Sequence, residues 1–167
     1  MKQKILSTII LFLILFVLFF IIFLKLYNEK KQNINTTIET YQTICGKYAR
    51  GEIKIDSKNL SVGIADDNCK QNLGLSGKIS LADDTGMFFV FKMPGNYGFW
   101  MKDMNFPLDI VWMDDNFGII GIEKALATST YPNIYGKKYF AKYVLEIPAG
   151  YSDKNNIKIG DKILLIE

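Results

Sequence analysis

The sequence predicts a mainly β protein: a small antiparallel β-barrel or sandwich with one or two short helices, preceded by a single N-terminal transmembrane helix. Three observations support this prediction. A long apolar run lies near the N-terminus, apolar residues alternate with period two after residue 51, and turn residues recur at short intervals. At 167 residues the chain has room for one domain plus an appendage.

The apolar run at residues 5–24 contains no charge, glycine or proline. A helix of this length spans roughly 30 Å, the thickness of a bilayer core. No small-residue cleavage site follows the run, so we expect an uncleaved anchor rather than a signal peptide. Cys45 lies too far beyond the run for a lipoprotein, and it follows no small residues.

The predicted organisation places the β-domain outside the cytoplasm. A four-residue stub ahead of the apolar run resembles a signal anchor, although lysines flank both sides. The expected segments are a stub at 1–4, the anchor at 5–24, a polar stalk or linker at 25–50 and the β-domain at 51–167.

The net charge of +3 is divided unevenly along the chain. Residues 1–50 carry seven basic and two acidic side chains, a net +5, whereas residues 51–167 carry thirteen and fifteen, a net −2. A basic segment beside a bilayer favours anionic headgroups. The domain itself has no basic stripe of the kind that binds nucleic acid. We therefore expect the membrane as a partner and no nucleic acid.

Eight short segments carry the pattern of strands. The first two alternate apolar and polar residues, as half-buried strands do, and the third is a continuous apolar run typical of a buried strand. In order, the predicted strands are 52–55, 59–66, 86–91, one beginning at 99, 108–114, 119–126, 142–150 and 162–166. No long helical pattern separates them, so we expect no helical crossovers.

One short helix is predicted between the second and third strands, at residues 66–73. Asp66 or Asp67 can cap its N-terminus, and Gly74 follows directly after its end.

Proline and glycine set the boundaries in the second half of the domain. Pro107 has no N–H for a ladder, so it is expected at the start of the fifth strand or in a bulge. Gly118 lies near the return of the hairpin that joins the fifth and sixth strands. Residues 127–141 are expected to form a long loop. Pro148 ends the seventh strand, and a Gly-Asp turn at 160–161 precedes the last.

The two cysteines, Cys45 and Cys69, are too few for a disulfide framework. Pairing in an oxidising space would stabilise the domain by roughly 3 kcal/mol on the chain-entropy model. The sequence does not show the Cα separation that a disulfide requires. We therefore expect two unrelated small residues, one in the linker and one in the short helix, with pairing as the alternative.

Three motifs in order, "GLSGKISLADDTGMFFVF", "FWMKDMNFPLDIVWMD" and "YVLEIPAGYSDKNNIKIGDKI", resemble the domain of unknown function 192 family. The resemblance covers about residues 59–166. It implies a compact β-rich domain in a small exported or membrane-anchored protein, and it implies no activity. Many members carry a Glu-Arg pair and an Arg before "GL". Here "DNCKQNLGLSGK" offers only Lys70 and Lys78, which lack the bidentate fork of arginine.

The residue types present exclude several chemistries. The chain has no histidine, which removes Ser-His-Asp and Cys-His mechanisms and the commonest metal ligand. Two cysteines without histidine are insufficient for a zinc site, and no phosphate-binding glycine motif is present. We expect no cofactor and no metal, and assign no catalytic residue.

The candidate site consists of carboxylates, a lysine and an aromatic residue. Strand alternation places Asp109 beside Val111 on one face of its strand, and Glu146 beside Val144 on one face of another. A carboxylate among apolar strand residues requires a partner. We hypothesise a ligand pocket formed by Trp100, Lys102, Asp103, Asp109 and Glu146.

Three functions remain open at this point. The first is an envelope-associated binding or accessory module, in which Trp100 stacks on a ligand such as an envelope glycan. The second is a hydrolase of an envelope polymer, with Asp109 and Glu146 as an acid/base pair. The third is a structural domain that packs on a membrane-protein partner, where both carboxylates only accept backbone N–H groups and the tryptophans belong to the core.

Overall fold

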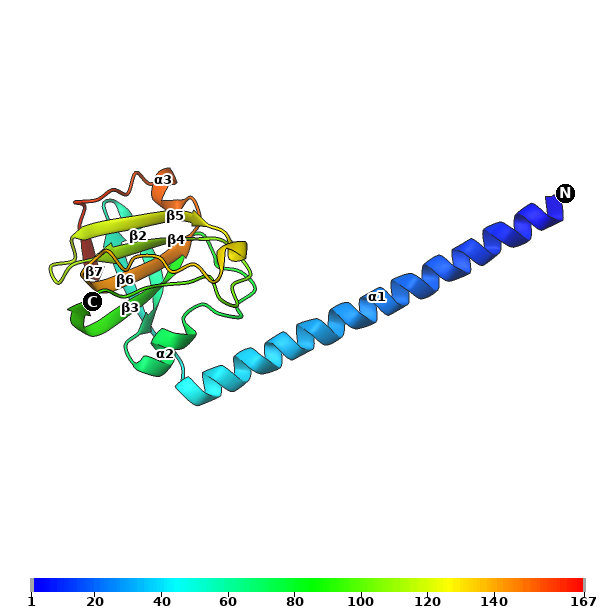
Figure 1. The fold of residues 1–167 in the computed structure, drawn as a ribbon, viewed down its shortest axis with the longest axis horizontal. Helices are drawn as coiled ribbons and strands as arrows, with labels where there is room; N and C mark the ends of the chain where they lie inside the picture. Colours follow the sequence, from blue (N-terminus) through cyan, green and yellow to red (C-terminus); the bar gives the residue numbers. More distant parts are fainter. Residues whose placement is uncertain (1, 167) are drawn as a thin grey trace. The chain divides into compact units, whose positions relative to one another are not determined.

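The structure, a computed structural model, describes the backbone of residues 2–166 and side chains from residue 12 onward, except those of residues 34, 35, 37–42 and 44. The chain forms two compact units, Met1–Thr40 and Tyr41–Glu167. The first consists of most of helix α1 (Lys2–Cys45), drawn in blue to cyan in Figure 1. Within the described side chains, Phe12–Asn33 is long and apolar enough to cross a membrane. The side chains of residues 5–11, the first part of the predicted anchor, lie outside the described ones.

The predicted polar stalk is helical over most of its length. Residues 2–45 contain neither proline nor glycine, so nothing interrupts the backbone hydrogen bonds of α1. Gly46 follows with a φ of 73°, the left-handed conformation that ends many helices. The first strand begins three residues later, at Ala49.

The second unit is one seven-stranded sheet with few helices, which confirms a mainly β fold (Figure 1). The strands are β1 Ala49–Ile55, β2 Lys58–Ala65, β3 Thr85–Gly95, β4 Leu108–Met113, β5 Ile119–Leu126, β6 Ala141–Pro148 and β7 Ile163–Ile166. Their order across the sheet is β5-β4-β6-β3-β2-β1-β7. The short helices are α2 Asn68–Leu73, η1 Thr128–Thr130 and α3 Tyr151–Lys154.

The sheet is not purely antiparallel, contrary to the prediction. β2 and β3 pair in parallel, from Ser61 opposite Thr85 to Ala65 opposite Phe89. Parallel neighbours need a crossover, and the segment containing α2 supplies it. The predicted helix at 66–73 is confirmed, with Asp67 accepting a hydrogen bond from the Lys70 N–H as the N-cap. A crossover this short gives no long helical pattern in the sequence.

The strand predicted to begin at residue 99 does not form. Phe99 makes one isolated bridge with Tyr135, and residues 100–107 are irregular. The backbone pairing of this segment is limited to that bridge, in which Phe99 and Tyr135 exchange hydrogen bonds of 3.0 and 2.8 Å.

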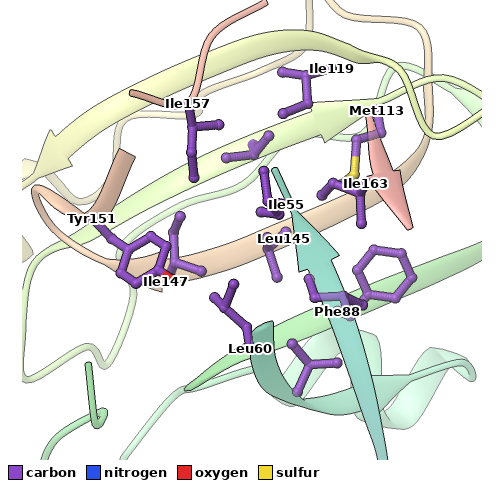
Figure 2. Packing of buried hydrophobic residues seen from close by; sticks show 13 residues of the cluster. Ile55, Leu60, Phe88, Met113, Ile119, Leu145, Ile147, Tyr151, Ile157 and Ile163 are labelled. Atoms are coloured by element: carbon purple, nitrogen blue, oxygen red, sulfur yellow. The ribbon is translucent and has the colours of Figure 1, made fainter. Parts of the chain in front are cut away.

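The single sheet curls into a half-barrel, so the sandwich alternative is wrong. Its two edge strands meet at one end, where Gly118 bridges Lys162 and the Ile163 N–H donates to the Phe117 carbonyl at 3.1 Å. All seven strands contribute side chains to one buried cluster, which therefore lies inside the curl (Figure 2). Tyr151 from α3 and Ile157 join this inner core.

A second apolar cluster covers the outer face of β2 to β6. It is centred on Trp112, Phe89 and Met87, all fully buried. Irregular segments of the chain pack on it, contributing side chains such as Leu75 and Met101. These covering segments, rather than the sheet alone, shape the cavities described below.

The two cysteines are paired, which corrects the expectation of unrelated residues. Cys45 at the end of α1 and Cys69 in α2 form a disulfide with a Cα–Cα distance of 5.4 Å. The crossover places α2 beside the end of α1, and this proximity depends on tertiary packing that the spacing of two cysteines does not reveal.

Candidate functional site

A cavity of about 460 Å³ opens on the outer face of the domain, between α2 and the segment around Trp100. Its wall combines polar side chains of α2, an aromatic group and one buried carboxyl. The lining residues are Asn68, Gln71, Asn72, Leu73, Gly74, Leu75, Ser76, Phe91, Tyr97, Gly98, Phe99, Trp100, Met104 and Glu146. We call this space the Glu146 cavity.

Glu146 is the buried polar group of this cavity. It lies on β6 with Val144 on the outer face, as alternation predicts, and only 5% of its surface is exposed. Its Oε2 atom has no hydrogen-bond partner in the described part of the chain. Burial raises the pKa of Glu146 to about 8, so the carboxyl is largely protonated at neutral pH. A protonated carboxyl offers one donor and further acceptor capacity to a ligand.

Aromatic rings form the opposite wall. Trp100 is half exposed, so its indole is available to a ligand. The Phe91 and Tyr97 rings stack with centroids 3.5 Å apart, and Phe99 meets Phe89 edge-on at 4.9 Å. The Phe91, Tyr97 and Phe99 rings are thus packed against other rings, whereas the Trp100 ring is the exposed one.

Helix α2 and the glycine that ends it lie beside the Glu146 carboxyl. The Gln71 side chain donates to the Val90 carbonyl at 2.9 Å, which fixes the helix to β3. Gly74 ends the helix so close to the sheet that a Cβ there would lie 3.7 Å from Glu146 Oε2. The Tyr48 hydroxyl donates to the carbonyls of Lys70 and Gly74 at 3.3 and 3.1 Å. Burial, with the nearby Glu146, raises the pKa of Tyr48 to about 12.

Asp109 lies on the other face of the sheet and does not reach this cavity. In the β4–β6 ladder Asp109 pairs with Ile147 and Ile110 pairs with Glu146, so the two carboxyls point to opposite faces. Asp109 is fully buried and accepts hydrogen bonds from the N–H groups of Ala125, Gly150 and Ser152 at 2.8, 3.1 and 2.9 Å. Asp109 and Glu146 therefore do not face one common cavity, as the hypothesised acid/base pair would require.

The side chains of Lys102 and Asp103 are exposed and outside the cavity lining. Their backbone carbonyls accept hydrogen bonds from the Ser76 hydroxyl at 3.2 Å and the Gly77 N–H at 2.8 Å. These contacts tie the Trp100 segment to the segment after α2. Of the five residues proposed from the sequence, the structure brings only Trp100 and Glu146 together.

The sequence reasoning missed the polar residues of α2, chiefly Asn68, Gln71 and Asn72. The helix itself was predicted, but the parallel crossover that carries it over Glu146 was not. Among the described residues, no group of three or more His, Cys, Asp or Glu side chains could hold a metal ion.

These features define a small β-domain with one curled sheet and an open, ligand-sized cavity on its outer face. The chain belongs to the DUF192 family, described as uncharacterized ACR, COG1430, whose model matches residues 51–165. The resemblance seen in the three sequence motifs is thereby confirmed.

Relatives share the domain over most of their own length. The chain is 30% identical over 118 residues to the UPF0127 protein PH1112 of Pyrococcus horikoshii, covering 65% of this chain and 93% of the relative. The crystal structure of a Sinorhizobium meliloti 1021 protein, named as a candidate transcription regulator, matches with a TM-score of 0.69 and 25% identity over 71% of this chain and 95% of that one. A protein of unknown function from Novosphingobium aromaticivorans matches with a TM-score of 0.62 and 25% identity, covering 70% and 84%.

Proposed function

We propose that this chain is a membrane-anchored binding module of the cell envelope. In this proposal its β-domain holds a small uncharged ligand, a fragment of an envelope glycan, in the Glu146 cavity. The observation that carries the proposal is the buried, unpartnered Oε2 atom of Glu146 on the cavity wall. Buried polar atoms are nearly always hydrogen-bonded, so this atom favours a missing partner.

The chemistry of the wall favours an uncharged, hydroxyl-rich ligand. A protonated Glu146 can donate to one hydroxyl group and accept from another, whereas a cation would require the costly buried carboxylate. Trp100 offers an apolar face on which a sugar ring can stack. The volume of about 460 Å³ lies in the usual range for small-molecule sites, about 300 to 1,000 Å³.

Two further observations support an envelope location. The N-terminal helix contains a span, Phe12–Asn33, that fits a bilayer by length and composition. The Cys45–Cys69 disulfide suits an oxidising space outside the cytoplasm. Together they agree with an anchor whose C-terminal domain faces away from the cytoplasm.

A thermal-shift screen of the full-length chain in nanodiscs tests the ligand proposal. The panel contains peptidoglycan fragments, other envelope glycans, nucleotides and divalent metals. Binding to the native state raises the melting temperature by mass action, so we expect a rise with a glycan fragment. Trp100→Ala and Glu146→Leu should each abolish that rise, because leucine can neither donate nor accept a hydrogen bond, whereas glutamine would reproduce both functions of a protonated carboxyl.

Phe140→Ala is the matched control, because Phe140 is 63% exposed and lies outside the cavity lining. The melting temperature of the Phe140→Ala variant should rise with the glycan, as that of the unchanged chain does. A screen in which no glycan raises the melting temperature contradicts the proposal, as does a rise that persists in both cavity variants.

Membrane anchoring is tested independently by washing membranes with alkaline carbonate. The full chain should remain in the membrane fraction, and a chain lacking residues 1–24 should be released. Release of the full chain would contradict the anchor while leaving the ligand proposal intact.

A further inference from the structure

A second cavity, of about 540 Å³, lies beside the start of β1 and does not share the Glu146 carboxyl. Three basic side chains line it: Lys47 and Arg50 from the start of the domain, and Lys78 from the segment after α2. Ser61 and Ser80 are among the hydroxyl-bearing residues that also line it. We call this space the basic cavity.

The positive charge in the basic cavity has no counter-charge. No Asp or Glu is among its lining residues, and none of the three cations forms a salt bridge with any residue that the structure describes. Lys78 is partly buried, and burial together with the neighbouring Arg50 lowers the pKa of its ammonium group. Like charges placed together in a partly desolvated cavity repel each other, and an anion would relieve that repulsion.

The fold holds these cations together by specific contacts. Lys47 lies two residues after Cys45, which the disulfide ties to α2. Tyr48 lies between Lys47 and Arg50 and is bound through its hydroxyl to two carbonyls of the α2 segment. Arg50 pairs with Gly63 in the β1–β2 ladder, which fixes its backbone beside the cavity. These contacts fix the backbone that carries the basic residues beside the cavity.

We infer that the basic cavity binds a phosphate monoester dianion, a ligand distinct from the one proposed for the Glu146 cavity. Arg50 supplies a planar fork that matches two phosphate oxygens, and the two lysines supply point charges. The hydroxyls of Ser61 and Ser80 can donate to the remaining oxygens. Such a phosphate can come from a free metabolite or from a lipid headgroup.

Calorimetric titration of the full-length chain in phosphatidylcholine nanodiscs tests the free source, with glycerol 3-phosphate as the probe and glycerol as its uncharged control. In a second arm the nanodiscs contain phosphatidic acid, and the melting temperature of the domain is compared with that in phosphatidylcholine alone. Arg50→Gln and Lys47→Gln are the main variants, since both side chains are exposed and their loss leaves the core unchanged. Lys78→Met keeps the apolar stem of the partly buried lysine and should weaken binding as well.

Each main variant should weaken glycerol 3-phosphate binding about tenfold, the factor expected when one charge-assisted contact is lost. Lys58→Gln removes one exposed charge from β2 outside the cavity and should leave the affinity unchanged. Stabilisation confined to phosphatidic acid nanodiscs and lost in Arg50→Gln supports the same site with a lipid headgroup as its ligand. An absence of binding in both arms overturns the inference. Binding that Lys58→Gln and Arg50→Gln weaken equally also overturns it.

Discussion

At the scale of single residues, Glu146 makes the most direct prediction, because its pKa of about 8 is far above the value of an exposed carboxyl. Between about pH 5 and 8 the folded state retains a proton that the unfolded state releases. The free energy of unfolding should therefore fall as pH rises through this window, by up to about 1.4 kcal/mol per pH unit, and level off above pH 8.

The absence of histidine makes this pH dependence interpretable, since few other groups titrate in the window. Urea unfolding of the full chain at a series of pH values, followed by tryptophan fluorescence, measures it. Glu146→Gln cannot ionise and should remove the slope, whereas Glu52→Gln, at an exposed position, should retain it. A slope that survives in Glu146→Gln would show that another group carries it.

Asp109 should behave as a structural residue. Asp109→Asn replaces one accepting oxygen by an NH₂ group that faces backbone donors, so we expect a loss of about 2 to 4 kcal/mol in unfolding free energy. Asp115→Asn, at an exposed position, should cost little by the same denaturation measurement. Because Asp109 is on the face opposite the Glu146 cavity, any glycan affinity should be unchanged in the folded variant. An altered affinity would contradict this assignment.

Alternation along each strand correctly predicted that Val144 and Glu146 share one face and that Asp109 shares the other face of its strand with Val111. It could not relate the two strands to each other, because the register of β4 against β6 is a tertiary property. For this reason two residues on opposite faces were placed in one hypothetical pocket.

At the scale of secondary-structure elements, the disulfide joins the end of α1 to α2 across 24 residues of sequence. Replacing both cysteines by serine should lower the unfolding free energy by about 3 kcal/mol on the chain-entropy model. Thermal unfolding of the full chain with and without a reducing agent should show the same loss in the unchanged protein and no further effect in the double variant. Equal melting temperatures in all four samples would contradict a structural role for the pair.

In the segment 127–141, packing leaves no room for a side chain at Gly136. A Cβ at Gly136 would overlap the Trp112 ring, and its φ of 79° is also unfavourable for other residues. Gly150 has a similar φ of 82° with nothing near a Cβ. Gly150→Ala should therefore cost about 1 kcal/mol from backbone strain alone, and Gly136→Ala about 3 kcal/mol or more.

Chemical denaturation of the two glycine variants measures this difference. The Trp112 indole N–H donates to the Tyr97 carbonyl at 3.1 Å, so displacement of the ring in Gly136→Ala should also disturb the wall of the Glu146 cavity. An equal loss of unfolding free energy in the two variants would mean that the contact with Trp112 adds nothing to the cost of a side chain at position 136.

Local chemistry predicted some elements well and others not at all. The hairpin around Gly118 and the strand at 119–126 follow from turn residues and alternation, and the structure confirms both. Helix α3 was missed because four residues opened by Gly150 carry no helical periodicity. The parallel pairing of β2 and β3 was missed because a short crossover and a loop have the same sequence pattern.

At the scale of the whole molecule, both proposed ligand sites depend on the irregular segments that cover the outer face of the sheet. The inner face of the curled sheet is filled by apolar side chains from every strand, which leaves little space for a ligand. The outer face is covered by irregular segments, and both cavities lie where those segments meet the sheet. Alternation and turn residues predicted the β class of the domain, but the placement of the covering segments required the structure.

The measurement that tests the central claim most directly is acrylamide quenching of tryptophan fluorescence in the full chain, with and without peptidoglycan fragments. Trp112 is fully buried and inaccessible to acrylamide, whereas Trp100 is 50% exposed at the Glu146 cavity, so Trp100 accounts for the quenching. Peptidoglycan fragments that stack on Trp100 should reduce the quenching in the unchanged chain, and they should not change it in Glu146→Leu, which has lost both hydrogen-bonding groups. Quenching that the fragments do not change would contradict a glycan site in this cavity.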